Sequence, residues 1–381
     1  MTLDEARVLI VDDNIGNQEV LSAIVQSIGV TRIETALNGV EGLEAVRRDK
    51  PDIVLLDVLM PVMDGYEMCR RLRMEYSRDE LPVLFVTAFD NPDSRTNCFA
   101  AGGTDMVTKP INAAEVMARL NVHLENRILV TGLKAYQSRM TEELELARDT
   151  QETLHPHPSQ LTDIEARRAI RVTGIIETSS ELGGDFWTVF ETHDNNLGLL
   201  VADFTGHGVA AAFNTVRLHA LMARRPWALR GPGELLEFLN HELKQLLPPG
   251  QFAAALACEL NAASGTLTCA GGLTPQPVLI EANGAARFLP VSGPPLGAFI
   301  DASYGEITLS MEPGAALLAY SDALLESMVD DKVAVTEDEL LAWSAEIGPG
   351  GDLVKGVLSR FHDRLPGQPP DDLTIVAMQR R

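Results

Sequence analysis

The sequence predicts two domains of different class, an α/β doubly wound parallel sheet followed by an α+β β-sandwich flanked by helices, with a helical coiled-coil linker between them. A length of 381 residues favours more than one domain. Short apolar runs alternate with helix-like segments in the first third of the chain, residues 113–154 contain no proline and one glycine, and strand-like runs dominate from about residue 169. We therefore expect the domains at 1–122 and 159–381, with the linker at 123–158.

The charge balance limits the classes of partner. The chain has 54 acidic and 31 basic residues, a net charge of −23, and no basic recognition helix, which together disfavour binding to nucleic acid. The N-terminus carries acids instead of a signal-peptide pattern, and no apolar stretch is long enough to span a bilayer. We expect a cytoplasmic protein with neither nucleic acid nor membrane as a partner. The four cysteines form no CxxC pair and are interpreted as reduced core thiols: Cys69, Cys98, Cys258 and Cys269.

In the first domain, polar residues follow the ends of apolar runs that predict buried parallel strands. The runs are Arg7–Val11 before Asp12 and Asp13, Ile53–Leu56 before Asp57, Val83–Val86 before Thr87, and Met106–Val107 before Lys109. The helix-like segments between them are Asn17–Ile28, Gly39–Arg48, Gly65–Met74 and Thr96–Ala101. Because ligands of doubly wound sheets gather at the carboxyl ends of the strands, we expect these polar side chains to converge in one crevice.

Three carboxylates in one crevice repel one another unless a cation lies among them. A hard divalent ion with oxygen ligands, such as Mg²⁺, suits this set. The ion would neutralise an incoming phosphoryl group, so that one carboxylate could attack phosphorus. Lys109 would then pair with the phosphate, and Thr87 would donate a hydrogen bond to it.

Four stretches, VLIVDDN, LLDVLMPVMDGYEM, VTA and TKPI, closely resemble the receiver domains of two-component systems, over about residues 5–122. The resemblance implies that Asp57 is the phosphoacceptor, that Thr87 and Lys109 form the switch, and that a sensor histidine kinase or phosphotransfer protein is the partner. The implied Mg²⁺ contacts are Asp12, Asp13, Asp57 and the backbone carbonyl of Leu59. The alternative is that the strand-end acids only cap helices. Receivers usually carry Tyr or Phe where this sequence has Met106, which puts the aromatic readout in doubt.

The linker segment shows apolar residues near heptad spacing, with a slip at Gly132. These residues are Leu120, Leu124, Ile128, Leu133, Tyr136, Met140, Leu144 and Ala147. The pattern predicts a receiver helix that continues into a broken coiled coil and forms a homodimer; the alternative is a helix packed within one chain. The segment His155–Pro158 ends the helix, because proline cannot continue it. Its two histidines are interpreted as part of a loop in preference to a metal clip.

The second domain begins with strand-like runs and adds helices later. The predicted strands are Ala169–Ile175, Phe186–Glu191, Leu197–Asp203, Phe252–Leu260, Gly265–Ala270, Val278–Glu281, Glu306–Leu309, Ala315–Tyr320 and Leu373–Gln379, and the predicted helices are Val209–Met222 and Glu234–Leu247. Aspartates follow or open these strands beside glycines: Asp185, Asp203, Asp322, Asp371 and Asp372. An all-oxygen set without cysteine or histidine spacing for zinc selects Mg²⁺ or Mn²⁺, and two such ions can activate water toward a phosphoryl group.

The order GGDF, DFTGHG, YSDALLE and DDLT closely resembles the PPM-type serine/threonine phosphatases of the SpoIIE-like branch, over about residues 145–381. The resemblance implies a pair of Mn²⁺ or Mg²⁺ ions and a phosphoprotein substrate, with a STAS-type anti-sigma-factor antagonist in a partner-switching pathway as its target. The implied metal residues are Asp185, Asp203, the carbonyl of Phe204, Asp322 and Asp371. Supporting roles are implied for Gly183 and Gly184, which let backbone approach the site, for Asp372, which orients ligands or water, and for His207, which either contacts the site or caps the next helix.

Two positions depart from that family's pattern. Ala323 stands where glycine usually follows the third-motif aspartate, and Leu273 occupies the region where an AGH motif is common. Neither departure removes a metal ligand, so we expect a metal-dependent protein serine/threonine phosphatase under receiver control. The alternative is a non-catalytic adaptor in which a phosphatase-like domain binds a sigma factor or its regulator. Adaptors of this build tend to lose the metal aspartates, and all of them are present here.

Overall fold

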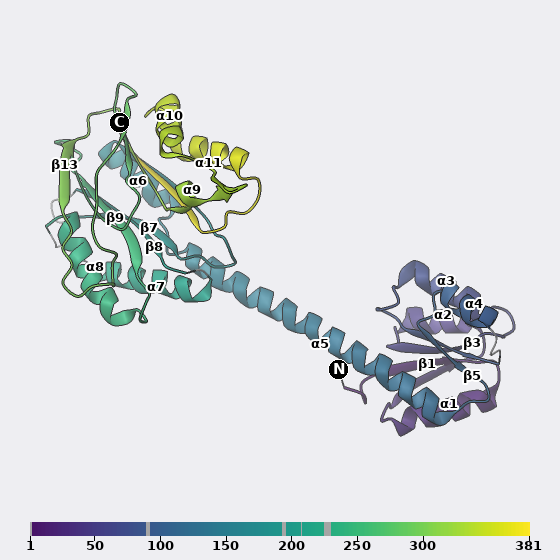
Figure 1. The fold of residues 1–381 in the computed structure, drawn as a ribbon. Coiled ribbons are helices and arrows are strands. Elements are labelled where there is room, and N and C mark those ends of the chain that lie inside the picture. Colours follow the sequence, from purple (N-terminus) through teal and green to yellow (C-terminus); the bar gives the residue numbers. More distant parts are fainter. Residues whose placement is uncertain (1, 89–91, 193–195, 207, 225–229) are drawn as a thin grey trace. The chain divides into compact units, whose positions relative to one another are not determined.

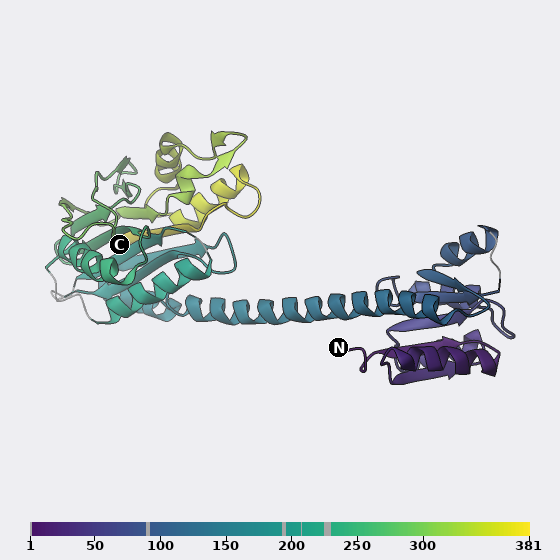
Figure 2. The same ribbon diagram turned by 60° about the horizontal axis from the view of Figure 1, so that its bottom comes forward.

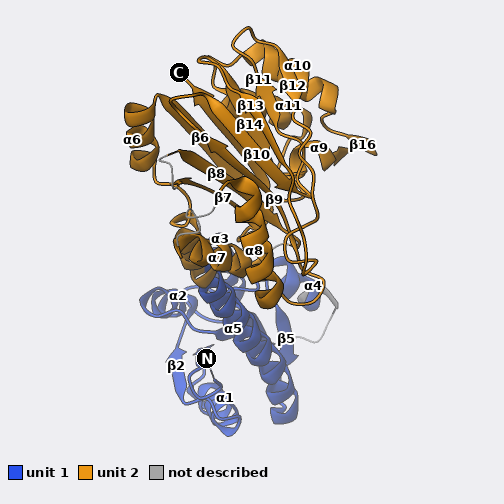
Figure 3. Cartoon of the chain, turned by 90° about the vertical axis from the view of Figure 1, so that its left-hand side faces the viewer, with its two compact units in different colours: residues 1–141 blue, residues 142–381 orange. Residues whose placement is uncertain are grey.

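The computed structural model describes residues 2–88, 92–192, 196–206, 208–224 and 230–381, and for residues 92–94 it describes the backbone alone. The chain divides into two compact units, residues 1–141 and 142–381 (Figure 3). Among the described residues, no helix is both long and apolar enough to cross a membrane.

The first unit is the expected doubly wound sheet, with all strands parallel in the order β2-β1-β3-β4-β5 (Figure 1). Its strands are β1 (Arg7–Val11), β2 (Arg32–Ala36), β3 (Ile53–Asp57), β4 (Val83–Thr87) and β5 (Asp105–Thr108). Its helices are α1 (Ile15–Ser27), α2 (Gly39–Arg48), α3 (Gly65–Glu75), α4 (Pro92–Ala100) and the first part of α5 (Ala113–Glu152). One apolar core joins the sheet to α2, α3 and α4, and the other joins its opposite face to α1 and α5. Both faces are therefore covered, which explains the continuous apolar runs of β1, β3 and β4.

Strand β2 has no counterpart among the predicted strands. It lies at the edge of the sheet, and its sequence RIETA is polar and mostly half-exposed instead of being an apolar run. An edge strand needs only one apolar face, so the search for buried runs does not find it.

Helix α5 is a single helix of 40 residues that passes through Gly132 without interruption. The expectation of a seam that begins at Leu120 is wrong, because Leu120 and Leu124 are fully buried in the core of the first unit. Farther along, Leu133, Tyr136 and Met140 are exposed, and the described part of the chain leaves their apolar surface uncovered. The helix ends before the predicted His–Pro segment, in which His157 accepts a hydrogen bond from the Ser159 N–H and so caps the next helix.

The second unit consists of two antiparallel sheets that pack face to face, with helices on both outer faces (Figure 2). The first sheet has the order β13-β10-β9-β8-β7 and the second has the order β12-β11-β14-β17-β6. Its strands are β6 (Ile170–Glu177), β7 (Asp185–Glu191), β8 (Leu197–Phe204), β9 (Ala253–Leu260), β10 (Thr266–Gly272), β11 (Val278–Ile280), β12 (Ala286–Phe288), β13 (Glu306–Ser310), β14 (Ala316–Tyr320), β15 (Met328–Val329), β16 (Lys332–Val333) and β17 (Leu373–Arg380). Its helices are α6 (Pro158–Arg168), α7 (Val209–Ala223), α8 (Pro232–Leu246), α9 (Ala323–Glu326), α10 (Glu337–Ile347) and α11 (Leu353–Arg364).

Alternation along the strands assigns each side chain to one of the cores. In β8, Leu197, Leu199 and Val201 lie in the core between the two sheets, whereas Leu200 and Ala202 pack in the core that contains α7 and α8. Helices α10 and α11 cover the outer face of the second sheet in the same way. Helices α6, α9, α10 and α11, the strand β12 and the β15–β16 hairpin are absent from the predicted elements, so the predicted sandwich is confirmed but was incomplete.

Candidate functional sites

The predicted residues of the first unit gather at the carboxyl ends of its strands. Asp57 is the last residue of β3, and Asp12 and Asp13 follow β1. One carboxylate oxygen from each of the three lies within 4.8 Å of the others, with Asp12 and Asp57 buried and Asp13 exposed. Such a set of oxygen atoms suits a hard divalent ion.

Lys109 supplies a positive charge to the same crevice. Its Nζ lies 2.9 Å from Asp57 Oδ2 and 2.9 Å from Asp12 Oδ2. Burial raises the pKa of Asp57, and the ion pair with Lys109 partly opposes that rise. Burial lowers the pKa of Lys109, but its hydrogen bonds to Asp12 and Asp57 outweigh burial and leave it raised. The lysine therefore stays charged and holds both acids in place.

The remaining predicted residues, Thr87 and Leu59, also lie at or just after the carboxyl ends of strands. Thr87 is the fully buried last residue of β4, and its carbonyl accepts a hydrogen bond from the Lys109 N–H at 2.7 Å. Leu59 follows Asp57 by two residues in an exposed loop. Met106, the departure from the receiver pattern, is buried among Phe85 and other core residues, so an aliphatic thioether fills the place of a ring.

In the second unit, Asp185 and Asp203 face each other across neighbouring strands. Asp185 opens β7, Asp203 lies one residue before the end of β8, and the two are partners in the antiparallel register. Two carboxylates directly opposite each other repel and destabilise a strand pair. The sequence places both acids at strand ends, but only the pairing of β7 with β8 shows that they are neighbours.

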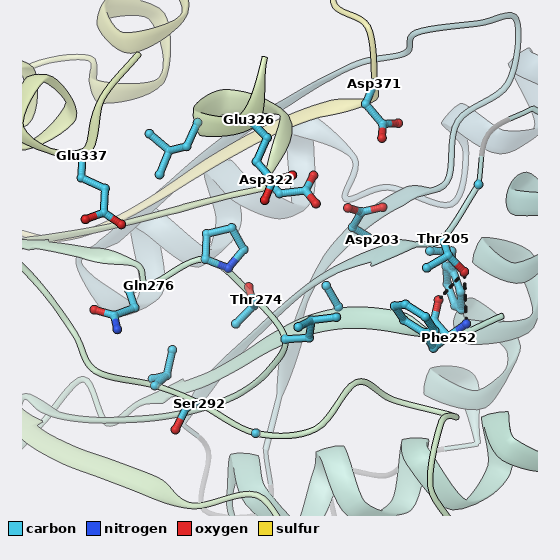
Figure 4. Close-up of a pocket in the computed structure, with 18 residues that line it drawn as sticks. Asp203, Thr205, Phe252, Thr274, Gln276, Ser292, Asp322, Glu326, Glu337 and Asp371 are labelled. Atoms are coloured by element: carbon cyan, nitrogen blue, oxygen red, sulfur yellow. Dashed lines mark hydrogen bonds between the residues drawn. The ribbon is translucent and has the colours of Figure 1, made fainter. Parts of the chain in front are cut away.

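Asp203 also lines a pocket of about 740 Å³ together with Asp322 and Asp371. Figure 4 shows these three side chains reaching toward a common space, with Thr274 and Gln276 on a segment across it. Asp322 follows β14, and Asp371 lies two residues before β17. Adjacent antiparallel strands of the second sheet thus bring acids from distant parts of the sequence to one edge.

The surroundings of the aspartates at this pocket disfavour their charged forms. Burial, reinforced by Asp322 and Asp371, raises the pKa of Asp203 to about 8. Burial and the charge of Asp203 raise the pKa of Asp185 well above its usual range. Burial, Glu326 and Asp371 raise the pKa of Asp322. Among the lining residues that the structure describes, none is lysine or arginine.

A pair of divalent cations fits this donor set. Asp185 is almost fully buried, and its Oδ1 has no hydrogen-bond partner within the described part of the chain. An unsatisfied buried carboxylate oxygen is costly, and a cation would satisfy it. The acids are all oxygen donors, which suits Mg²⁺ or Mn²⁺. Asp185 and Asp203 could contribute to one ion, and Asp322 and Asp371 could contribute to another.

Asp372 acts on the loop that carries Asp185. Its Oδ1 accepts hydrogen bonds from the Ser179 N–H at 2.6 Å and the Ser179 hydroxyl at 2.9 Å, and its Oδ2 accepts one from the Gly184 N–H at 2.5 Å. A Cβ on Gly183 would meet Asp372 at 2.9 Å, and one on Gly184 would meet the Phe204 carbonyl oxygen at 2.9 Å. Both glycines are therefore required for space, and Asp372 orients the loop through hydrogen bonds.

The two departures from the phosphatase pattern have different structural consequences. Ala323 begins α9 and is buried, and it has no left-handed backbone that would call for glycine. Leu273 does have such a backbone, with a φ of 50°, and lines the pocket. His207, predicted as a contact or a cap, lies outside the described residues.

Several residues that complete this site were not among the predicted site residues. Gln151, in the last turn of α5, donates from Nε2 to the Gly183 carbonyl at 2.7 Å and to Thr215 Oγ1 at 3.0 Å, and its Oε1 accepts from the Gly183 N–H at 3.3 Å. Thr374 donates to Asp185. Glu326 and Glu337 line the pocket as well. The helical spacing of Glu326 four residues after Asp322 is the only signal that could have indicated one of them.

Two family models match separate parts of the chain, and residues 122–192 lie outside both matches. Residues 8–121 match the family described as Response regulator receiver domain. Residues 193–381 match the family described as Stage II sporulation protein E (SpoIIE). Receiver domains and PPM phosphatases generally use divalent metal ions, in agreement with the donor sets of both sites.

Individual relatives match one unit at a time. The response regulator PleD of Caulobacter vibrioides is 35% identical over 129 residues, which cover 34% of this chain and 28% of PleD. The response regulator MprA of Mycobacterium leprae is 42% identical over 118 residues, covering 31% of this chain and 50% of MprA. The chain thus spans between about a quarter and a half of the length of these curated relatives. The SiaA-PP2C domain of Pseudomonas aeruginosa shares the fold, with a TM-score of 0.56 at 18% identity, over 64% of this chain and 98% of that domain.

Proposed function

This chain belongs to the response regulators, with a receiver domain followed by a phosphatase-family domain of the SpoIIE type, and from that premise we propose that phosphorylation of Asp57 controls a metal-dependent phosphoserine/phosphothreonine protein phosphatase. The observation that carries the proposal is the pairing of Asp185 with Asp203 across β7 and β8. Two facing acids destabilise a domain that only binds proteins, whereas in a catalytic domain bound cations would offset this cost and the carboxylate oxygens would serve as their ligands.

The receiver half of the proposal rests on the crevice around Asp57. Asp57 is the phosphoacceptor, and Asp12, Asp13 and the Leu59 carbonyl would hold Mg²⁺ beside it. Lys109 already contacts Asp57 Oδ2 at 2.9 Å, so it is in place to pair with a phosphoryl group formed there. The kinase or phosphotransfer protein that such a receiver requires would dock near this crevice.

The phosphatase half rests on the charge of its pocket. When bound, two Mn²⁺ or Mg²⁺ ions would supply the positive charge that polarises a phosphate ester and activates water. Asp185, Asp203, Asp322 and Asp371, with the Phe204 carbonyl, would hold them. Thr274, Gln276 and Ser292 line the other wall and offer uncharged hydrogen-bonding groups to a substrate. An anionic phosphoprotein would depend on the ions for binding, because no lysine or arginine is among the described lining residues.

Control by the receiver would pass along α5. Gln151 lies in the last turn of this helix and bonds to both backbone groups of Gly183, two residues before Asp185. A rotation or shift of the helix end would therefore act directly on the loop that positions a metal ligand. The exposed apolar residues of α5 support a homodimer through the linker, and we propose a STAS-type anti-sigma-factor antagonist as the phosphoprotein substrate.

A metal-dependent phosphatase assay with the full chain tests the function. We expect hydrolysis of an aryl phosphate and of a phosphoserine protein with Mn²⁺, loss of both with EDTA, and a change in rate when acetyl phosphate loads the receiver. A chain that binds Mn²⁺ yet hydrolyses neither substrate in any receiver state would instead favour the adaptor function.

A further inference from the structure

Within the described part of the chain, one oxygen of the Asp185 carboxylate accepts a hydrogen bond and the other has no hydrogen-bond partner. Thr374 is the second residue of β17 and is fully buried. Its Oγ1 donates a hydrogen bond to Asp185 Oδ2 at 2.5 Å. Asp185 Oδ1 is buried without a partner in the described part of the chain. We propose that Thr374 is a positioning residue that fixes Asp185 so that Oδ1 is the oxygen presented to a metal ion.

Thr374 is itself held on its backbone side. Its N–H donates to Ser321 Oγ at 2.8 Å, and the Ser321 hydroxyl donates to the Asp372 carbonyl at 3.0 Å. Ser321 directly precedes Asp322, so this network connects three of the acidic motifs through buried groups. Because its backbone is held in this way, the Thr374 hydroxyl stays beside the Asp185 carboxylate and restricts the orientation of that carboxylate.

A core threonine and a positioning threonine predict different results for the same substitutions. Thr374→Val keeps the shape and removes the hydroxyl, whereas Thr374→Ser keeps the hydroxyl. If Thr374 only packs, Val should be neutral and Ser should be the more harmful change, because Ser lacks a methyl group. If it positions Asp185, the order reverses. This inference rests on the proposed metal site, but its readout is metal binding and not hydrolysis.

The experiment is a calorimetric titration of the full chain with Mn²⁺. An Asp13→Asn background removes a receiver ligand, so that the receiver does not add its own binding isotherm. We expect Thr374→Val to weaken Mn²⁺ binding about tenfold or more, and Thr374→Ser to stay within about threefold, since groups that orient metal ligands typically contribute that much. Far-UV circular dichroism in EDTA checks the fold.

Each outcome decides a different point. Unchanged Mn²⁺ binding in Thr374→Val would overturn the role of Thr374 and leave the proposed function in place. If that variant does not fold, Thr374→Ala must show the same loss of binding, and normal binding by Ala would overturn the role. A reference chain that binds no Mn²⁺ would overturn the proposed function and this inference together.

A second observation, on the opposite wall of the pocket, concerns Leu273. The chain leaves β10 at Gly272, and Leu273 then takes a φ of 50° while its side chain is 55% exposed. Its N–H donates to the Gly293 carbonyl at 2.9 Å, which fixes this geometry. Glycine or asparagine suits such a backbone, and a polar residue suits such exposure. Leucine is therefore unfavourable for folding at this position, because of both the left-handed backbone and the exposure of its apolar side chain.

A residue that is unfavourable for folding and faces a pocket points to a role in binding. Leu273 lines the same pocket as Pro275, Val291 and the acids. We infer that it contacts the substrate next to the phosphoresidue and selects an apolar side chain there. This inference also rests on the proposed function.

Two phosphoserine peptides that differ only in the flanking residues, leucine or glycine, test the inference. The natural chain should prefer the leucine peptide by about tenfold in kcat/KM. Leu273→Asn should bring the ratio near one and should raise the Tm in EDTA, because asparagine tolerates the left-handed backbone. A ratio unchanged by Leu273→Asn, or near one in the natural chain, would overturn the inference. Hydrolysis of neither peptide by the natural chain would overturn the proposed function.

Discussion

The two acidic sites of this molecule handle the same electrostatic problem in different ways. In the receiver crevice, Lys109 contacts both Asp57 and Asp12 at 2.9 Å, so a covalently attached charge offsets the carboxylates. In the phosphatase pocket, Asp185 and Asp203 lie opposite each other with no lysine or arginine among the described lining residues. The first site therefore balances its acids with a charge of its own, whereas burial and mutual repulsion raise the pKa values of the acids in the second.

This difference in counter-charge is related to what each site has to bind. A receiver must remain folded through cycles of phosphorylation, and a built-in cation steadies it in every state. If the second unit hydrolyses phosphate esters as proposed, its acids would act as metal ligands, and an internal lysine would compete with the ions for the same oxygens. We therefore expect metal ions to affect both the stability and the activity of the second unit, and to affect the stability of the first unit much less.

The largest effect should come from Asp203→Asn. Asp203 faces Asp185 and lines the pocket, so the substitution removes a charged metal ligand from its centre. Loss of such a ligand should cost several kcal/mol of transition-state stabilisation, roughly a thousandfold in kcat. Asp322→Ala should have a comparable effect. Steady-state hydrolysis of an aryl phosphate with Mn²⁺ measures both.

The same variant should gain stability when metal is absent. In EDTA at pH 8.5, Asp203→Asn should raise the free energy of unfolding by about 1 kcal/mol or more, because it removes a like charge opposite Asp185. Urea unfolding followed by tryptophan fluorescence measures this. A variant that loses both activity and metal-free stability would contradict the contrast between the two sites.

In the receiver, Asp57→Asn should remove the nucleophile and leave the crevice intact. Acetyl phosphate with Mg²⁺ should label the natural chain and label the variant at least about twentyfold less, because an amide does not attack phosphorus. Asp79→Asn, which alters an exposed acid of the first unit outside this cluster, serves as the matched control and should leave labelling unchanged. Intact-mass spectrometry quantifies the label. Equal labelling of the natural chain and Asp57→Asn would show that another residue accepts the phosphoryl group.

The pH dependence of metal-free stability should separate the two sites further. The pKa of Asp203 is raised from 3.8 to about 8, so the folded state holds a proton that the unfolded state releases above pH 4. Stability therefore falls as pH rises through this window and levels off above about pH 8. Burial lowers the pKa of His155 from 6.5, which gives the opposite slope below pH 6.5. Between pH 6.5 and 8 the acids should dominate, with a loss of about 1 to 2 kcal/mol.

Urea unfolding in EDTA at these two pH values measures the loss. Asp203→Asn should flatten the slope, and saturating Mn²⁺ should do the same in the natural chain. A slope that persists in both cases would assign the pH dependence to other groups.

The sequence predicts the parts of both sites that depend on strand ends, and it fails where pairing or packing decides. Asp12, Asp57 and Lys109 could be placed together because parallel strands align their carboxyl ends at one edge. Asp185 faces Asp203 because of the register between the antiparallel strands β7 and β8. The sequence pattern of each strand does not predict that register. The edge strand β2 escaped detection because it is only half buried.

Buried hydrogen bonds were the hardest features to foresee. Gln151 looked like a polar position near the end of an exposed helix, yet it is buried against Gly183. Thr374 belongs to the DDLT motif, but the motif alone does not show that its hydroxyl donates a hydrogen bond to Asp185. Glutamine and threonine make such buried hydrogen bonds only where the fold supplies partners. Their spacing along the chain does not predict these bonds.

The smallest effect, and the one that joins the two sites, should come from Gly132→Ala in α5. The helix passes through Gly132 unbroken, and an added Cβ would meet nothing within 4 Å, so alanine should stabilise the helix by up to about 1 kcal/mol. If signalling bends or unwinds the helix here, that gain opposes it and should reduce the effect of Asp57 phosphorylation on hydrolysis by about twofold to fivefold. Lys134→Ala, also on α5, is the matched control and should leave the effect unchanged.

Sedimentation of the full chain tests whether the linker forms a dimer. Leu133, Tyr136 and Met140 are exposed at near-heptad spacing, so we expect a dimer that Leu133→Glu dissociates. A monomer at high micromolar concentration, with and without acetyl phosphate, would refute pairing through the linker and leave a shift of the helix end at Gln151 within one chain as the route of control.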